Sequence, residues 1–326
     1  MRRGQNMKEY QIEKNQSGQR LDKFLAKVLK AAPKSFIYKM LRKKNITMND
    51  QKATGNEILQ LNDQIKLFLS DETFDKFSLE QGKDDIILSG LPVKKLWIIF
   101  EDEDILVFNK PAGMLSQKAQ AQDYSANEYI MAYLYQKGEL TQEALKTFRP
   151  SICNRLDRNT SGILLFGKSL AGLQQLSLWL NERLIQKFYL CVVAGQLNKP
   201  MHIGGYLHKD ELTNKVTIMD TPDLENKPIE TAYEPLGGTP EWTLLKVQLI
   251  TGRSHQIRAH LSSIGHPILG DSKYDPDRLA KNLNLQYKIQ NQMLHSWIIH
   301  TPDGRQWEAP VPESFQPFIK QQRSLT

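Results

Sequence analysis

The chain has 326 residues, of which 40% are hydrophobic and 24% charged, which is the composition of a soluble globular protein with room for two or three domains. It contains no apolar run of about 18 residues, and no apolar stretch follows its charged N-terminus, so we expect neither a membrane span nor a secretory signal. The two cysteines, Cys153 and Cys191, form neither a metal-type pair nor a disulfide framework. A reducing, cytoplasmic location fits best.

The net charge of +7 is unevenly distributed. Residues 1–70 hold 15 lysines and arginines against 6 acidic residues, whereas the rest of the chain holds 28 against 30. A small basic unit ahead of a near-neutral large one indicates a module that binds a polyanion such as nucleic acid. The alternative is a domain that is merely well solvated.

Composition divides the chain into four segments. We expect an N-terminal tail at residues 1–15 and a small domain at residues 16–70. Residues 71–95 become acidic and polar, which predicts a linker. Residues 96–326 then form a large domain.

The small domain is predicted to combine two helices with short strands. Between residues 20 and 30 the apolar side chains fall on one helical stripe, and a second helix is predicted from Lys34. Strands are predicted around the turns at Asn49-Asp50 and Asn62-Asp63.

The large domain is predicted to be mixed α and β. Short apolar runs predict strands at residues 96–100, 105–110, 162–168, 188–195 and 243–250. Helices are predicted at residues 126–136, 142–146 and 170–186, the last capped by Ser169. Because strands and helices do not alternate regularly, we expect an α+β sheet over a doubly wound one.

The segment NRLDRNTSG, residues 154–162, places Asp157 between Arg155 and Arg158, ahead of a predicted buried strand. The flanking positive charges favour the ionised carboxylate, which can act as a nucleophile, a base or a metal ligand. The alternative is a loop aspartate that holds a turn together with Asn159 and Thr160.

A second segment, TGRSHQIRAHL at residues 251–261, follows a predicted strand. Ser254 is a candidate cap for a helix whose first turn carries His255 and Arg258. An arginine at a helix start opposes the helix dipole, so we expect a compensating anionic group nearby. No metal is expected, because metal-ligand spacing is absent from the histidines of this region, His255, His260 and His266.

Two further segments have ordinary structural interpretations when taken alone. Tyr189 lies in a predicted strand, with its side chain on the same face as Lys187, and is typical of a core tyrosine. The sequence KPAG at residues 110–113 is typical of a turn that ends a strand.

Together these segments resemble the RluA family of RNA pseudouridine synthases, in its RluC- and RluD-like branch, whose signature is Arg-Leu-Asp followed by Thr-Ser-Gly. The family order is kept by KPAGM, NRLDRNTSGILLFGKS, KFY, TGRSHQIRAHL and GHPILGDSKY, and the ending MLHSWIIHTPDGRQWEAPVPESF also matches. The basic module, with GQRLDKFL and KSFIYKMLRKKNITMND, resembles the S4-like RNA-binding domain named after a small-subunit ribosomal protein. The resemblance covers roughly residues 16–316.

The resemblance implies a central, mostly antiparallel or mixed sheet flanked by helices and loops. It implies that Asp157 is the catalytic nucleophile, that Tyr189 stacks on the target base and that Arg258 pairs with the aspartate. Arg155 would help to push the uridine out of its RNA stack. Asn154 stands where the family commonly has histidine, which leaves any family role for that histidine open and does not touch Asp157.

The chemistry of pseudouridine formation agrees with these residues. The C1′–N1 bond must break, and the uracil must rotate and rejoin the sugar through C5, which requires no cofactor or metal. A carboxylate must attack C1′ or take a proton from C2′, inside a pocket that keeps the detached base from leaving. We favour proton abstraction, with a glycal intermediate. A paired uridine must also be flipped out before it can react.

The expected partner is RNA, with large-subunit ribosomal RNA favoured over transfer RNA, and we expect a monomer. Alternatives are a non-catalytic RNA-binding or ribosome-assembly factor on the same scaffold, and a hydrolase that uses Asp157 and His255. The presence of the aspartate, tyrosine and arginine together favours an active synthase. In the small domain the candidate RNA-binding residues are Arg20, Lys34, Tyr38, Arg42, Lys43 and Lys44.

Overall fold

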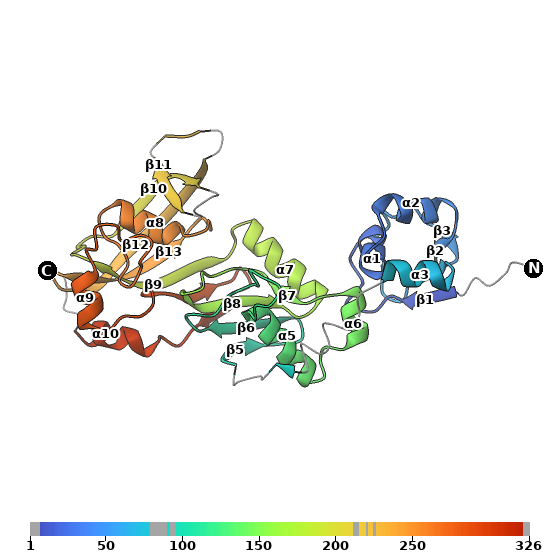
Figure 1. Cartoon of the computed structure of the whole chain (residues 1–326), viewed down its shortest axis with the longest axis horizontal. Helices are drawn as coiled ribbons and strands as arrows, with labels where there is room; N and C mark the ends of the chain where they lie inside the picture. The colour runs from blue at the N-terminus through green and yellow to red at the C-terminus, as the bar shows by residue number, and fades with distance from the viewer. Residues whose placement is uncertain are drawn as a thin grey trace, which may run out of the picture.

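The computed structural model describes residues 7–78, 90–91, 96–210, 215–219, 221–223 and 226–321. Figure 1 shows an elongated molecule with a small unit at its N-terminal end and a large unit built around one long sheet. None of the helices in these described ranges is long and apolar enough to cross a membrane.

The small unit packs helices against a four-stranded antiparallel sheet of order β1-β4-β2-β3. Its strands are β1 (Met7–Gln11), β2 (Ile46–Met48), β3 (Gln51–Lys52) and β4 (Gln64–Phe68), and its helices are α1 (Leu21–Val28), α2 (Lys34–Arg42) and α3 (Asp71–Ser78). The stripe predicted for the first helix is buried in the core, through Leu21, Phe24, Leu25 and Val28. Two helices and short strands were therefore predictable here from periodicity.

The small unit also contains elements on either side of residues 16–70. The predicted tail contains β1, which pairs with β4 along its whole length. The predicted linker begins with α3. The ring of Phe77 in this helix packs against that of Phe36, with centroids 4.5 Å apart, and its carbonyl accepts a hydrogen bond from the Ala31 amide. The remainder of that segment, apart from residues 90–91, lies outside the described residues.

The large unit contains an eleven-stranded sheet of order β11-β10-β12-β13-β9-β14-β8-β6-β5, with β15 beside β14 and β7 beside β8. Its strands are β5 (Ile98–Glu101), β6 (Ile105–Lys110), β7 (Ser151–Ile152), β8 (Ser161–Gly167), β9 (Gln186–Ala194), β10 (Met201–Lys209), β11 (Val216–Met219), β12 (Lys227–Gly238), β13 (Trp242–Leu249), β14 (Leu294–His300) and β15 (Gln306–Glu308). The described strand pairs are antiparallel except β8 and β14, which run parallel. This confirms the predicted mixed, mostly antiparallel α+β fold.

Both faces of the central strands are covered by apolar groups. In β8, Leu164 and Phe166 belong to one hydrophobic core, whereas Ile163 and Leu165 belong to another on the opposite face. A strand buried on both faces reads as a continuous apolar run, which explains the sequence ILLF. The helices are α5 (Ala126–Gln136), α6 (Gln142–Thr147), α7 (Leu170–Asn181), α8 (Gln256–Ser263), α9 (Lys281–Gln286) and α10 (Gln316–Gln321), with a short 3-10 helix η1 (Glu313–Phe315).

The two units meet through mainly polar contacts. The amide of Gln16 donates to the hydroxyl of Thr147 at 2.8 Å, and both side chains are buried. Lys14 pairs with Glu103 at 3.0 Å near the same boundary. A polar boundary of this kind places the small unit without merging its core with that of the large unit.

The order β8-β14-β9 determines where the candidate site residues lie. Ser296 of β14 lies opposite both Gly162 of β8 and Tyr189 of β9. Gly162 has φ of 108°, and a methyl group there would overlap the backbone of Ser296. Only glycine allows this close approach. As a result, the loop that carries Asp157 is held near Tyr189.

Candidate active site

A pocket of about 810 Å³ opens where the loop between β7 and β8 meets β9 and the start of α8. Its lining includes Asp157, Tyr189, His255 and Arg258, which the sequence analysis named as candidates for catalysis. These residues come from segments up to about a hundred positions apart. The fold therefore brings the predicted catalytic residues into one cavity.

The loop around Asp157 is anchored on both sides. The Asn154 side chain donates to the Ile163 carbonyl at 3.2 Å and accepts from the Leu165 amide at 2.7 Å. On the other side, the Thr160 amide donates to the Asp157 carbonyl at 3.1 Å. The Asn154 side chain thus fixes the loop to the main chain of β8. Within this fixed loop the side chain of Asp157 remains 27% exposed.

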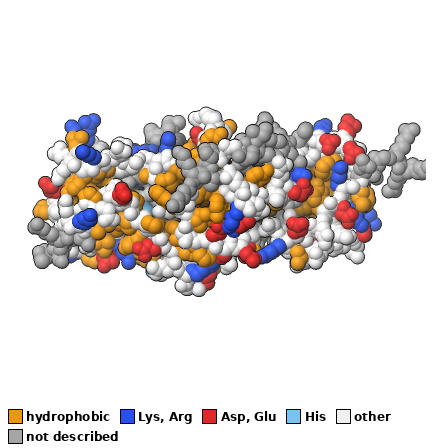
Figure 2. All heavy atoms as spheres, turned by 90° about the horizontal axis from the view of Figure 1, so that it is seen from below, with side chains coloured by type: hydrophobic (Ala, Val, Ile, Leu, Met, Phe, Trp, Pro, Cys, Tyr) orange, Lys and Arg blue, Asp and Glu red, His pale blue; other side chains and the backbone are white. Residues whose placement is uncertain are grey.

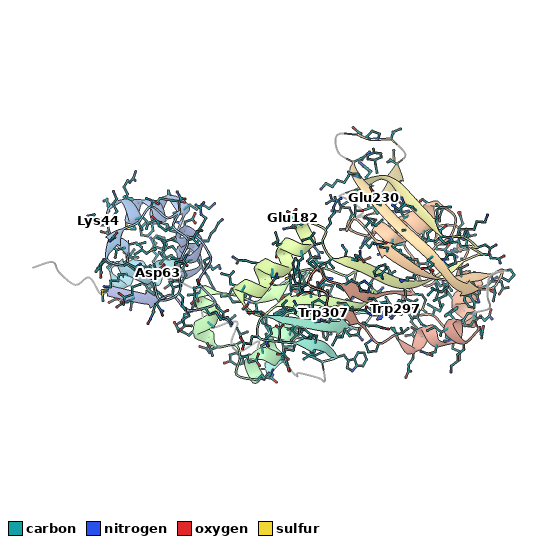
Figure 3. The ribbon with its side chains drawn as sticks, turned by 180° about the vertical axis from the view of Figure 1, so that it is seen from behind. Lys44, Asp63, Glu182, Glu230, Trp297 and Trp307 are labelled. Atoms are coloured by element: carbon teal, nitrogen blue, oxygen red, sulfur yellow. The ribbon has the colours of Figure 1, made fainter. Side chains whose placement is uncertain are left out.

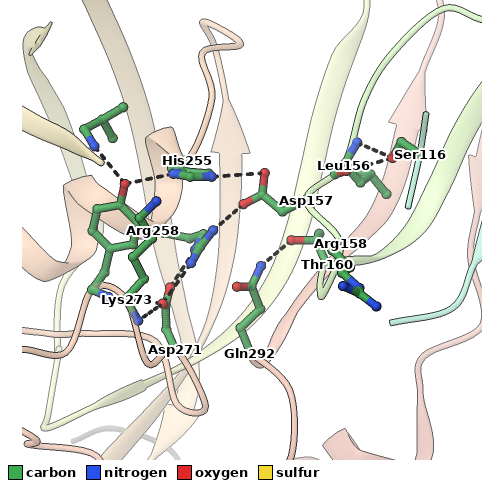
Figure 4. Close-up of polar contacts among 12 residues, drawn as sticks. Ser116, Leu156, Asp157, Arg158, Thr160, His255, Arg258, Asp271, Lys273 and Gln292 are labelled. Atoms are coloured by element: carbon green, nitrogen blue, oxygen red, sulfur yellow. Dashed lines mark hydrogen bonds and ion pairs between the residues drawn. The ribbon is translucent and has the colours of Figure 1, made fainter. Parts of the chain in front are cut away.

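Arg258 holds Asp157 by one hydrogen bond of 2.6 Å, from Nη1 to Oδ2. The rest of its guanidinium forms a bidentate pair with Asp271, from Nε at 2.6 Å and from Nη2 at 2.9 Å (Figure 4). Burial acts to lower the pKa of Arg258, but the bonds and charges of Asp271 and Asp157 outweigh it and raise that pKa above its ordinary value. The negative charge expected beside this arginine therefore comes from two carboxylates, those of Asp157 and Asp271. Sequence reasoning had missed Asp271, although it lies in the matching segment GHPILGDSKY.

His255 immediately precedes α8 and occupies its N-cap position. The helix begins at Gln256 and its N-cap is His255, in the left-handed region with φ of 55°, so the predicted cap Ser254 was wrong. This backbone turn directs the imidazole into the pocket, with Nε2 3.8 Å from Oδ1 of Asp157. Its Nδ1 lies 2.9 Å from the hydroxyl of Tyr274.

Tyr189 is buried in β9 and contributes to the pocket wall. Burial raises its pKa to about 12; a hydrogen bond from Ser296 opposes this shift, and the charge of Asp157 adds to it. The phenol is therefore neutral near pH 7. Lys187, two residues earlier on the same strand face, lines the same pocket.

Lys110 gives the KPAG turn a role beyond ending a strand. Its fully buried ammonium donates to the carbonyl oxygens of Pro111 at 3.0 Å, Met114 at 2.8 Å and Arg158 at 3.0 Å. It therefore ties the turn to the residue that follows Asp157. Burial lowers the pKa of Lys110 to about 7, and the negative charge of Asp157 opposes that shift.

The pocket lining is strongly cationic. Its basic residues are Arg155, Arg158, Arg183, Lys187, Arg253, Arg258 and Lys273, and Asp157 is the one acid among the lining residues that the structure describes. By contrast, acidic and basic side chains are interspersed over the face shown in Figure 2. A cationic pocket with a single carboxylate suits a polyanionic substrate.

The candidate RNA-binding residues of the small unit lie away from this pocket. Lys34, Tyr38 and Arg42 are exposed and four residues apart on α2, so they share one helix face. Figure 3 shows Lys44 on the side of the small unit that points away from the large unit.

Two of these candidates also make contacts within the small unit. Arg20 binds Asp22 through two hydrogen bonds of 3.0 Å and Asn56 through one of 2.6 Å. The hydroxyl of Tyr38 donates to the same Asp22 at 2.9 Å. Tyr38 therefore links α2 to α1, and Arg20 links the start of α1 to Asn56.

Comparison with known proteins identifies the family. Residues 104–263 match the RNA pseudouridylate synthase family, and residues 19–65 match the S4 domain. The chain is 33% identical over 300 residues to ribosomal large subunit pseudouridine synthase C of Haemophilus ducreyi, covering 90% of this chain and 87% of that protein. It is 32% identical over 306 residues to an uncharacterized RNA pseudouridine synthase of Mycoplasma genitalium, covering 92% and 91%.

Solved structures share the fold. The human protein RNA pseudouridylate synthase domain containing 4 superposes with a TM-score of 0.56 at 22% identity, over 72% of this chain and 96% of that one. The family model and the relatives define the class of this protein as an enzyme that acts on RNA, and the shared fold agrees with that class. The chain belongs to the RNA pseudouridylate synthase family and carries an S4 domain, which confirms the resemblance seen in the sequence.

Proposed function

We propose that this protein converts uridine to pseudouridine in large-subunit ribosomal RNA. The observation that carries the proposal is the pair of Asp157 and Arg258 beside Tyr189, in a pocket whose other charged lining residues are arginines and lysines. The relatives named for synthesis of pseudouridine in the large ribosomal subunit, aligned over most of their length, support the choice of RNA.

Asp157 is the group that reacts with the sugar. Arg258 binds its Oδ2, which leaves Oδ1 as the oxygen without a direct hydrogen bond among the described residues. In the route that we favour, Oδ1 takes the C2′ proton while the C1′–N1 electron pair leaves with the uracil. The rotated base then attacks C1′ through C5 as Asp157 returns the proton to C2′. Loss of the C5 proton to water and uptake of a proton by N1 complete the exchange.

Tyr189 and the cationic lining hold the nucleotide during this exchange. The phenol ring is fixed in a central strand and offers a flat surface on which a flipped base can stack. Arg155 is exposed at the pocket edge, where a guanidinium can replace the uridine in the RNA stack. Arg158, Arg183, Lys187 and Arg253 also line the pocket and are candidates for contacts to the phosphates.

The small unit supplies a second attachment to the RNA. Its phosphate contacts come from four exposed basic residues, Lys34, Arg42, Lys43 and Lys44. Arg20 and Tyr38, which both bond to Asp22, add further contacts to the RNA. We propose that the protein acts as a monomer, because one chain by itself brings Asp157, Tyr189 and Arg258 together in the pocket. Ribosomal RNA is cytoplasmic in bacteria such as those of the relatives, and we place the protein there.

The test uses ribosomal RNA from a strain that lacks the protein and mass spectrometry of its fragments. The purified protein restores pseudouridine, and Asp157→Asn does not, although it still binds the RNA. Glu182→Gln is the matched control, because it also removes one carboxylate but lies at the exposed end of α7, outside the pocket lining. Turnover by Asp157→Asn would refute the role of the aspartate, and restored modification only in transfer RNA would refute the choice of substrate.

A further inference from the structure

A second chain of contacts reaches Asp157, separate from Arg258. The amide of Val216, the first residue of β11, donates to the hydroxyl oxygen of Tyr274 at 3.0 Å. The same oxygen lies 2.9 Å from Nδ1 of His255, whose Nε2 lies 3.8 Å from Oδ1 of Asp157. Figure 4 shows the imidazole pointing at the carboxylate. The inference below rests on the proposed function.

The hydrogen atoms of this chain can be assigned by accounting for each donor. Tyr274 is 3% exposed, so its hydroxyl proton needs an acceptor inside the protein. Among the residues that the structure describes, Nδ1 of His255 is the acceptor within hydrogen-bonding distance of that hydroxyl. Nδ1 therefore accepts, and a neutral imidazole must then carry its proton on Nε2.

The charges around His255 are consistent with a neutral ring of this tautomer. Burial lowers the pKa of His255; the charges of Arg258 and Lys273 act in the same direction, and those of Asp157 and Asp271 oppose them. With the proton on Nε2, an N–H group faces the carboxylate. The opposite tautomer would turn a lone pair toward that negative charge and leave the buried Tyr274 hydroxyl without an acceptor.

We infer that His255 is a positioning residue of the reaction, which orients Oδ1 of Asp157 toward the sugar through Nε2–H while Arg258 binds Oδ2. The separation of 3.8 Å is longer than a hydrogen bond, as catalytic contacts often are before the substrate binds. Tyr274 selects the tautomer, and the Val216 amide fixes Tyr274. The two oxygens of one carboxylate thereby have separate partners and separate tasks.

The tautomer is tested without reference to activity. In protein with ¹⁵N-labelled histidine, two-bond proton–nitrogen correlations distinguish Nε2–H from Nδ1–H, and loss of one pattern in His255→Gln assigns the signal. We expect Nε2–H in the wild type and a mixture in Tyr274→Phe. Tyr287→Phe is the control, because it removes only an exposed hydrogen bond to Gln321. An Nδ1–H ring in the wild type overturns the inference.

Kinetics of two substitutions separate a positioning role from a structural one. Glutamine places its amide N–H near the position of Nε2, whereas asparagine reaches only the position of Nδ1. The backbone at residue 255, with φ of 55°, favours asparagine. A purely structural role therefore predicts that His255→Asn is the better enzyme, and a positioning role predicts that His255→Gln is.

We expect His255→Asn to lower kcat about 10- to 100-fold with little change in KM, which is the range for losing one hydrogen bond to a charged group. His255→Gln should recover most of that loss. Equal kcat values for the two variants, or the reverse order, would overturn the inference. If the wild type fails to modify ribosomal RNA, the proposed function fails, and the tautomer measurement still decides whether an N–H group of His255 faces Asp157.

Discussion

Arg258 binds two carboxylates, and replacing each with an amide should affect a different property. The change at Asp271 should mainly lower stability, and the change at Asp157 should mainly abolish activity. Asp271 is the buried one: its side chain is 1% exposed, it accepts the bidentate pair from Arg258, and it also accepts the amides of Lys273 and Tyr274 at 3.0 and 3.2 Å. Asp157 is 27% exposed and accepts one bond from the same guanidinium.

Removing one partner of a buried ion pair leaves the other charge poorly compensated, which costs about 3–5 kcal/mol. Asp271→Asn should therefore lower the free energy of unfolding of the large unit by that amount. For Asp157→Asn the expected loss is about 1 kcal/mol, because only one partly exposed bond is lost and Asp271 still neutralises the arginine. The stable variant should be the inactive one.

Urea unfolding followed by tryptophan fluorescence measures this difference in the appropriate part of the molecule. All five tryptophans lie in the large unit, the first of them at Trp97. The transition midpoint should fall clearly for Asp271→Asn and shift little for Asp157→Asn. Equal stability losses in the two variants would show that Arg258 depends on both acids alike, which would contradict the argument from burial.

Three further predictions concern other parts of the chain. Replacing the basic run at residues 42–44 with alanine should reduce the slope of log affinity against log salt by up to about 2–3 and leave kcat at saturating RNA unchanged; an unchanged slope would remove this run from the RNA contact. Gly162→Ala should lose about 3 kcal/mol or more of stability, since the methyl group meets the Ser296 backbone at a φ of 108°, and a wild-type urea midpoint would contradict that. Burial lowers the pKa of His295 to about 4 against a small opposing effect of the Ala309 backbone, so the unfolded chain binds a proton that the folded one does not. As the pH is lowered from 6 to 4, this group should lower the free energy of unfolding by about 1.4 kcal/mol per pH unit. His295→Asn, which can still bond Ser161, should lose that part of the pH dependence in unfolding titrations.

Features that depend on local pattern were predictable from the sequence. The apolar run at residues 163–166 indicated a buried strand because both faces of β8 are covered. Ser169 indicated the start of α7, and its side chain accepts from the Gly172 amide at 3.0 Å. The charge of Arg258 at a helix start indicated a nearby anion without identifying it.

Features that depend on distant pairing were not predictable in this way. Strand β1 is mostly polar and alternates between exposed and half-buried residues, so only its backbone pairing with β4 identifies it. Lys110 bonds to main-chain carbonyls, which every residue type possesses, and no side-chain pattern encodes such a contact. Asp271 lies in an irregular segment where neither helical nor strand periodicity marks it.

The parallel pairing of β8 with β14 has a consequence for the newly synthesised chain. Ser161 and His295 hydrogen-bond across 134 positions, so the loop of Asp157 gains its support from β14 only after nearly the whole sequence has left the ribosome. The small basic unit, in contrast, pairs its strands entirely within residues 7–68 and can fold long before. A chain that stops short of β14 would have a complete basic unit and an unfinished pocket. Premature termination would therefore give a chain that can still bind RNA through its small unit but lacks a complete active site.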